Sequence, residues 1–205
     1  MAILVTAFDT YDGWDENSSW SALTEYLGLY GAASDVRTRR YPVNLAQMRE
    51  RLEADLARGV DGVIHFGQRP GSAAVQLEAI ALNVAGTTRM PGGDFPPLVE
   101  DAPMAFRSHC PLGAWCEQLK QHAVPAEVSY HAGIYLCNAL MYLTHWWLHC
   151  RSLQLPVVFV HLPLTSGQVS RLDTAQPALD ARVLAETVRV LVEQMRRTAV
   201  SAAAV

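Results

Sequence analysis

The stretch NLAQMRERLEADLARGVDGVIHFG (44–67) contains one expected helix followed directly by one expected strand. Residues 44–59 carry an apolar stripe at helical spacing; they begin at Asn44, a good helix cap, and end at Gly59, a residue that stops helices. Residues 60–67 are a short apolar run, which is typical of a strand buried on both faces. A helix that leads into such a strand is the building unit of an α/β protein.

The same alternation continues on both sides of this stretch. Toward the N-terminus, AILVTAF (2–8) and SDVRTRRYPV (34–43) are expected strands, and a helix is expected from Asn17 or Ser18 to about Leu29. Toward the C-terminus, the expected helices are 111–123, 133–150 and 177–197, and the expected strands are 126–131, 155–163 and 76–84, the last of which also fits a helix. Residues 85–110 hold four Pro and three Gly and are expected to form a long loop.

This order of elements predicts the fold class. Strands that alternate with helices indicate an α/β protein, a three-layer α/β/α sandwich around a largely parallel, twisted sheet. A length of 205 residues fits a single domain spanning residues 1–205. In such sheets, ligands bind at the strand ends, where the chain turns into loops.

Composition and charge narrow the class of partner. Half of the residues are hydrophobic and 18% are charged, which excludes general disorder. No apolar run reaches the roughly 18–20 residues of a membrane span, so no membrane association is expected. The net charge is −4, and the only basic cluster, RTRR (37–40), is interpreted as a solvated strand edge, so no nucleic-acid partner is expected.

The N-terminus and the cysteines indicate a compartment. MAILVTAF has no Lys or Arg before its apolar run, which argues against a signal peptide, and a cytoplasmic location is expected. The four cysteines at 110, 116, 137 and 150 are therefore expected to be free thiols. Neither CxxC nor HExxH occurs, so no metal site is expected, and neither GxGxxG nor GxxxxGK[ST] occurs, so neither dinucleotide binding nor P-loop phosphate binding is expected.

One cysteine lies in a position that suits catalysis. SYHAGIYLCN (129–138) is expected to run from a strand through a small-residue turn into a helix, with Cys137 within about one turn of the helix start. Oriented N–H groups at a helix N-terminus favour a thiolate there. The alternative is that Cys137 is an ordinary apolar residue of a buried helix.

A nucleophilic cysteine needs a base and a group that orients the base. His161 lies at the end of the expected strand VVFVHLP, and Glu78 is an acid in the apolar stretch QLEAIALN, where a carboxylate needs a partner. Each residue alone also fits a purely structural role. Together with Cys137 they match a Cys–His–acid triad, in which the acid orients the imidazole and the imidazole activates the sulfur.

Four segments resemble the pyroglutamyl peptidase I (pyrrolidone carboxyl peptidase) family of cysteine peptidases. LVTAFDTYDGWDENSSW is similar to the family's LVTGFxPFGG…NPSW opening, and HFGQRPGSAAVQLEAIALN to the segment around its catalytic Glu. VSYHAGIYLCNALMY is similar to the SxxAGxYxCN segment of the nucleophile, and FVHLPLTSGQV to IHVPxxPEQ, which carries the triad His. The segments agree in order and approximate spacing over nearly the whole chain.

The resemblance implies a role for particular residues. Cys137 is the implied nucleophile, His161 the general base, and Glu78 the acid that orients it. For substrate binding, it implies that Phe8 and Tyr11 pack against the pyroglutamyl ring, that Gln68 lies on a loop near the polar edge of the ring, and that Arg89 lies near the oxyanion.

The resemblance also implies an activity. It implies a cytoplasmic thiol protease that removes N-terminal pyroglutamate from peptides through a thioester, without a cofactor, as a homo-oligomer, a tetramer or dimer. The opening departs from the family, because residues 7–13 (AFDTYDG) lack two Gly and a Pro that the family carries. This departure leaves two alternatives open: an amidase on the same scaffold that acts on a different cyclic amide or acyl group, and a non-catalytic homologue.

Overall fold

The centre of the molecule is a six-stranded sheet in the order β2-β1-β3-β8-β4-β7. The computed structural model describes residues 1–11, 13–86 and 94–202. The strands of this sheet are β1 (Ile3–Phe8), β2 (Val36–Tyr41), β3 (Gly62–Gln68), β4 (Val75–Glu78), β7 (Ala126–Ser129) and β8 (Val157–Leu162). Neighbouring strands are parallel except β4 and β8, which are antiparallel, so the predicted largely parallel sheet is confirmed.

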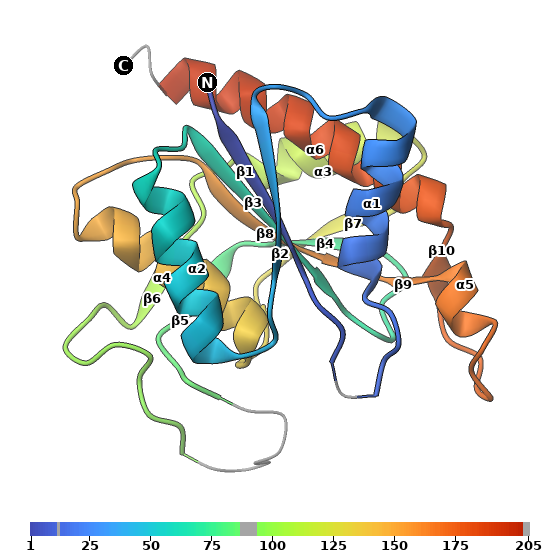
Figure 1. The fold of residues 1–205 in the computed structure, drawn as a ribbon, viewed down its shortest axis with the longest axis horizontal. Coiled ribbons are helices and arrows are strands. Elements are labelled where there is room, and N and C mark those ends of the chain that lie inside the picture. Colours follow the sequence, from blue (N-terminus) through green and yellow to red (C-terminus); the bar gives the residue numbers. More distant parts are fainter. Residues whose placement is uncertain (12, 87–93, 203–205) are drawn as a thin grey trace.

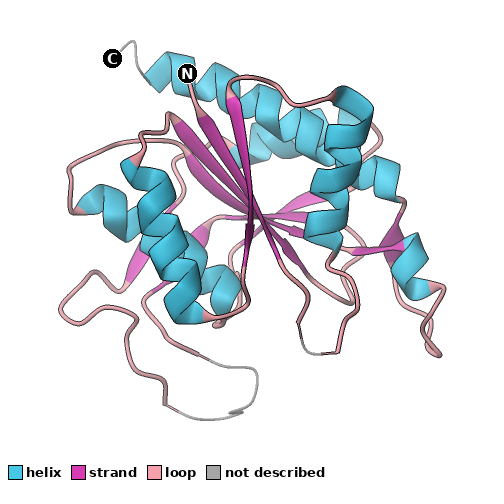
Figure 2. Ribbon diagram, in the orientation of Figure 1, coloured by secondary structure: helices cyan, strands magenta, loops and turns pink. Residues whose placement is uncertain are grey.

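Helices cover both faces of this sheet (Figures 1 and 2). One face carries α1 (Ser18–Tyr30), α3 (Leu112–Gln121) and α6 (Ala181–Ala202), and the other carries α2 (Leu45–Ala57) and α4 (Leu136–His149). Each face has its own cluster of buried apolar side chains, contributed by the sheet and by the helices that cover it. The predicted three-layer sandwich is therefore confirmed.

Local signals in the sequence account for the helix starts. Asn17 caps α1, its side chain accepting a hydrogen bond from the Ser19 N–H at 3.1 Å, and Asn44 caps α2 through the Gln47 N–H at 3.1 Å. Such caps satisfy N–H groups that have no partner within the helix. The predicted helix starts at these two positions are therefore confirmed.

The helix predicted at 133–150 begins later, at Leu136. Gly133 has a φ of +80°, in the left-handed region, and Tyr135 is extended with φ −105° and ψ −151°. Neither conformation belongs to an α-helix. The small-residue turn therefore extends through Tyr135, and Cys137 is the second residue of α4.

Several short elements differ from the sequence prediction. The segment 76–84 forms two strands, β4 and β5 (Ile80–Leu82), and β5 pairs with β6 (Ala105–Arg107), which lies inside the segment predicted as a loop. After β8 come β9 (Leu164–Thr165), α5 (Ser166–Val169) and β10 (Ala178–Leu179), and the C-terminal helix begins at Ala181 instead of residue 177. Elements of two to four residues depend on pairing partners distant in sequence, which local patterns do not reveal.

The basic cluster RTRR (37–40) lies in β2, the edge strand of the sheet. Arg39 forms an ion pair with Asp55 at 2.9 Å, and Arg40 forms one with Asp9. These contacts agree with the interpretation of this cluster as a strand edge. Among the described helices, none combines the length and the apolar character that crossing a bilayer requires.

A buried histidine joins the sheet to α4. The Thr144 hydroxyl donates to the Leu140 carbonyl at 2.8 Å, so it accepts from His65 Nε2 at 2.9 Å. His65 Nδ1 then accepts from the Thr6 hydroxyl at 2.7 Å, which defines a neutral tautomer. Burial lowers the pKa of His65 to about 3 and that of nearby His145 to about 4.

These two histidines predict a loss of stability in acid. In the unfolded chain each takes up a proton below about pH 6.5, whereas in the folded chain neither does so until pH falls to about 4 or 3. The free energy of unfolding is thus expected to fall by about 1.4 kcal/mol per pH unit per histidine between about pH 6 and pH 4. Urea unfolding across this range measures the slope.

A single variant isolates one of these contributions. His145→Phe keeps a ring stacked on Phe106 and removes a buried nitrogen, Nε2, that has no partner among the described residues. His145→Phe is expected to reduce the change in the free energy of unfolding with pH, between about pH 6 and pH 4, by about 1.4 kcal/mol per pH unit. His149→Phe, at an exposed position one turn further along α4, is the matched control. An unchanged slope in His145→Phe contradicts the assignment.

Candidate active site

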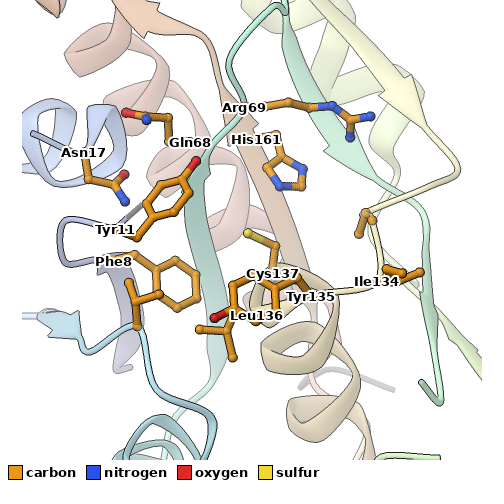
Figure 3. Close-up of a pocket in the computed structure, with 13 residues that line it drawn as sticks. Phe8, Tyr11, Asn17, Gln68, Arg69, Ile134, Tyr135, Leu136, Cys137 and His161 are labelled. Atoms are coloured by element: carbon orange, nitrogen blue, oxygen red, sulfur yellow. The ribbon is translucent and has the colours of Figure 1, made fainter. Parts of the chain in front are cut away.

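A cavity of about 290 Å³ opens at the carboxyl ends of β1, β3 and β8, beside the start of α4 (Figure 3). Phe8 ends β1, Gln68 ends β3, and His161 is the second-last residue of β8, and all three line the cavity. Cys137 lines it from α4. This is the position in which parallel α/β sheets place their ligands.

Glu78 and His161 meet through the one antiparallel pairing of the sheet. In the β4–β8 register, Gln76 lies opposite His161 and Glu78 lies opposite Phe159, so Glu78 is the diagonal neighbour of His161 on the same face. His161 Nδ1 lies 2.7 Å from Glu78 Oε1. Glu78 is fully buried and His161 is 5% exposed, so this hydrogen bond is shielded from solvent. With Nδ1 engaged, Nε2 is the ring nitrogen left to act in the cavity.

The Cys137 sulfur points toward the His161 ring (Figure 3). Gly67, the residue before Gln68 on β3, leaves the space that the sulfur occupies. A Cβ atom on Gly67 would lie 3.0 Å from Cys137 Sγ and 2.8 Å from Phe159 Cζ. Only glycine at position 67 therefore allows β3, Cys137 and the Phe159 ring to approach one another this closely.

A buried amide anchors the start of α4. Asn138, next to Cys137, is fully buried, and its side-chain oxygen accepts from the Leu82 N–H at 2.8 Å. Its side-chain nitrogen donates to the Leu82 carbonyl at 2.9 Å. Because Leu82 closes β5, which follows the strand carrying Glu78, this pair of bonds links the two segments that supply Cys137 and Glu78.

Burial opposes the charged forms of the two reacting groups. It raises the pKa of the Cys137 thiol to about 12; the Glu78 carboxylate adds to the rise and Arg69 opposes it. Burial also lowers the pKa of His161 below its ordinary value of 6.5, although the hydrogen bond with Glu78 raises it. The expectation that the helix N-terminus favours a thiolate is therefore not met in this state, because burial and the Glu78 carboxylate both raise the pKa of the thiol. At neutral pH the resting pair is a thiol and a neutral imidazole.

The residues expected to contact a substrate ring lie together on one side of Cys137 and His161. Phe8, Tyr11, Asn17 and Gln68 line this side of the cavity (Figure 3). Phe8 and Tyr11 contribute aromatic walls, and Asn17, which the sequence predicts only as a helix cap, also lines the cavity. Its side chain is occupied by the α1 cap and by a hydrogen bond to the Asp9 carbonyl at 2.9 Å.

Gln68 has one engaged and one unengaged side-chain atom. Its Oε1 accepts from the Ser18 N–H and from Gln168 Nε2, both at 2.7 Å, so the amide orientation is determined by its partners. Its Nε2 is buried and has no partner among the described residues. Gln68 is the last residue of β3 and not a loop residue as expected. It offers the cavity a donor that a ligand can satisfy.

Arg69 is a site residue that the sequence analysis missed. Its Nη1 donates to the His131 carbonyl at 3.1 Å and lies 3.5 Å from Glu78 Oε1. The available signal was its position directly after a buried strand, at the edge where α/β proteins place functional groups. The RPG sequence there resembles an ordinary turn, and the contact with Glu78 depends on the tertiary structure.

Arg89, predicted to lie near an oxyanion, is outside the described residues, so its role stays a prediction. Gly86, the last described residue before that stretch, packs against a residue that lines the cavity. A Cβ atom on Gly86 would lie 2.4 Å from the carbonyl oxygen of Ile134, a cavity-lining residue.

The fold and the site together indicate a class of protein, a cysteine peptidase built on a three-layer α/β/α sandwich. The model of the pyroglutamyl peptidase family matches residues 1–198, so the chain belongs to this family. Its similarity to known members extends over nearly the whole chain. It is 30% identical over 193 residues, 90% of this chain and 89% of the other, to a pyrrolidone-carboxylate peptidase of Clavibacter michiganensis.

Solved structures show the same fold. A mutant pyrrolidone carboxyl peptidase from Pyrococcus furiosus superposes with a TM-score of 0.87 at 28% identity, covering 97% of this chain and 100% of that one. The pyrrolidone carboxyl peptidase of Fervidobacterium islandicum superposes with a TM-score of 0.86 at 25% identity, covering 96% of this chain and 99% of that one. The expected family and fold are thus confirmed.

Proposed function

We propose that this chain removes N-terminal pyroglutamate from peptides, with Cys137 as the nucleophile, His161 as the general base and Glu78 as the residue that orients His161. Membership of the pyroglutamyl peptidase family supports the reaction. The observation that carries the assignment of residues is the buried 2.7 Å contact between Glu78 and His161, together with the presence of His161 and Cys137 in one cavity. The order of these groups matches a nucleophile, base and orienting acid.

Because Cys137 is a thiol and His161 a neutral imidazole at rest, the first step transfers a proton from the thiol to the imidazole. As Cys137 Sγ attacks the pyroglutamyl carbonyl carbon, its proton passes to His161 Nε2, and Glu78 stabilises the imidazolium that forms. Backbone N–H groups in the first turn of α4 are free of helix partners and stabilise the oxyanion. The C–N bond then breaks, and His161 gives its proton to the leaving amine.

The second step regenerates the enzyme. His161 takes a proton from water, whose oxygen attacks the thioester carbonyl. The C–S bond breaks, the pyroglutamate carboxylic acid leaves, and the proton on His161 returns to Cys137 Sγ. No step requires an external oxidant or reductant.

The ring side of the cavity suits a neutral lactam. Phe8 and Tyr11 provide aromatic walls for a flat ring, and the Gln68 Nε2 donor suits the lactam oxygen. An N-terminal proline has the same ring without that oxygen, so it leaves the buried Gln68 donor unpaired. Such a mismatch costs a site several kcal/mol of discrimination.

Gln68→Glu tests this recognition. Glutamate keeps an oxygen for the Ser18 N–H and for Gln168, but it replaces the buried donor by an acceptor. KM for a pyroglutamyl substrate is expected to rise about tenfold or more, with a smaller change in kcat. Steady-state kinetics measures this, and a melting curve verifies the fold. An unchanged KM in a folded variant means that Gln68 does not bind the lactam.

Hydrolysis of a fluorogenic pyroglutamyl amide tests the proposed function. Turnover of this amide, with none of the matching prolyl amide, is the expected result. The altered opening, AFDTYDG, favours one second candidate, an amidase acting on a different cyclic amide or acyl group. Turnover of such other amides alone supports that candidate, and no turnover of any amide supports a non-catalytic homologue.

We further propose that residues 1–205 act as one pyroglutamyl-peptidase domain in the cytoplasm, as a homo-oligomer, a tetramer or dimer. All four cysteines are free, and Cys150 is exposed, which suits a reducing compartment. Exposed apolar side chains, among them Met104 and Tyr130, supply surface for self-association. Light scattering after size-exclusion chromatography measures the assembly.

A further inference from the structure

Arg69 is the only lining residue of the described cavity that carries a formal charge at neutral pH. The other lining side chains are apolar or neutral polar, and the lowered pKa of His161 keeps that residue neutral. The Arg69 side chain is 37% exposed, so its guanidinium is accessible from solvent.

Arg69 lies on the side of the site opposite the ring-binding residues. In Figure 3, Phe8, Tyr11 and Gln68 lie to one side of Cys137 and His161, and the Arg69 guanidinium lies to the other. The acyl group and the leaving group of a substrate extend in opposite directions from the attacked carbonyl. With the pyroglutamyl ring on the first side, the leaving residue extends toward Arg69.

Two of the three nitrogens of the Arg69 guanidinium group, Nη2 and Nε, have no hydrogen-bond partner among the described residues. The third, Nη1, bonds the His131 carbonyl and approaches Glu78. The one acidic partner of Arg69 among the described ion pairs, Glu78, is already hydrogen-bonded to His161 through the same oxygen. A guanidinium with two unengaged nitrogens suits a carboxylate, which it binds with charge-assisted hydrogen bonds.

We propose that Arg69 binds the α-carboxylate of the leaving residue, which makes pyroglutamyl dipeptides the preferred substrate class of this enzyme. In a dipeptide that carboxylate is one residue beyond the scissile bond, whereas longer or amidated peptides present a neutral amide there. The inference rests on the proposed function, because it requires the ring to occupy the Phe8 side. It assigns to Arg69 a specificity role and no proton transfer.

The test compares pyroglutamyl-alanine with pyroglutamyl-alanine amide, which differ only in the charge of the leaving residue. For the unmodified enzyme, kcat/KM is expected to be about tenfold higher for the carboxylate. In Arg69→Gln the ratio of the two kcat/KM values is expected to fall to about one. Lysine keeps the positive charge but lacks the paired donors of a guanidinium group, so in Arg69→Lys the ratio is expected to lie between one and ten. Arg58→Gln, at an exposed arginine that directly follows α2 and does not line the cavity, is the control and keeps the tenfold ratio.

Two results overturn the inference. One is an equal kcat/KM for the two substrates in the unmodified enzyme. The other is a ratio that Arg69→Gln leaves unchanged; if both substrates lose activity equally in this folded variant, Arg69 only balances the charge of Glu78. An enzyme that hydrolyses neither substrate contradicts the proposed function itself, so the two failures are distinguishable.

Discussion

Replacing Cys137 with Ala is expected to lower kcat by more than about 10⁴-fold, because no other group in the cavity can form the thioester. The melting temperature is expected to change by a few degrees at most, since one sulfur atom is lost and the backbone of α4 is retained. Hydrolysis of the fluorogenic pyroglutamyl amide and a thermal melt measure the two effects.

Cys150→Ala is the matched control for this variant. Cys150 directly follows the last helical residue of α4, is exposed, and lies away from the cavity. Full activity is expected there, and likewise after substitution of buried Cys110 or Cys116 in a folded protein. Activity of Cys137→Ala well above background excludes Cys137 as the nucleophile.

Glu78→Gln is expected to lower kcat by about 10²-fold or more and to leave KM nearly unchanged. Glutamine preserves the size of the side chain, but its amide group can donate to His161 Nδ1. This stabilises the tautomer that carries a proton on Nε2, which cannot accept the thiol proton. The loss therefore falls on the chemical step, and steady-state kinetics separates it from binding.

The pH profile adds a readout that a merely structural role of Glu78 does not alter. Contact with the Glu78 carboxylate raises the pKa of His161 against the effect of burial. Without it, the pKa falls further, so the acid limb of kcat/KM is expected to shift to lower pH. Glu127→Gln, on the neighbouring strand β7, is the control. Full kcat in Glu78→Gln would reassign the acid, with Glu100 and Asp101 as the next candidates.

Patterns confined to a few residues determined which elements form. The apolar stripe and the Asn44 cap specify α2, and the apolar run that follows specifies β3, because caps and periodicity act within one or two turns of chain. The candidate residues Cys137, His161 and Glu78 were likewise recognisable, since each stands out in type from its own segment. The single domain also follows from length and composition and stays a prediction.

Contacts between distant segments decided how these residues meet. The antiparallel insertion of β4 beside β8 places Glu78 diagonal to His161, although 83 residues separate them. The contact between Arg69 and Glu78 also depends on this arrangement. A turn sequence alone does not show which carboxylate an arginine side chain reaches. Strand order and register depend on the packing of the whole sheet.

The charge state of the site was decided in the same way. A cysteine near a helix N-terminus predicts a lowered pKa, and the sequence by itself led to that expectation. The folded chain surrounds Cys137 with Gly67, Phe159 and His161, and the burial that results raises its pKa to about 12. A helix dipole is a property of a few consecutive residues, whereas desolvation is a property of everything packed around the sulfur, and only the tertiary structure contains the second.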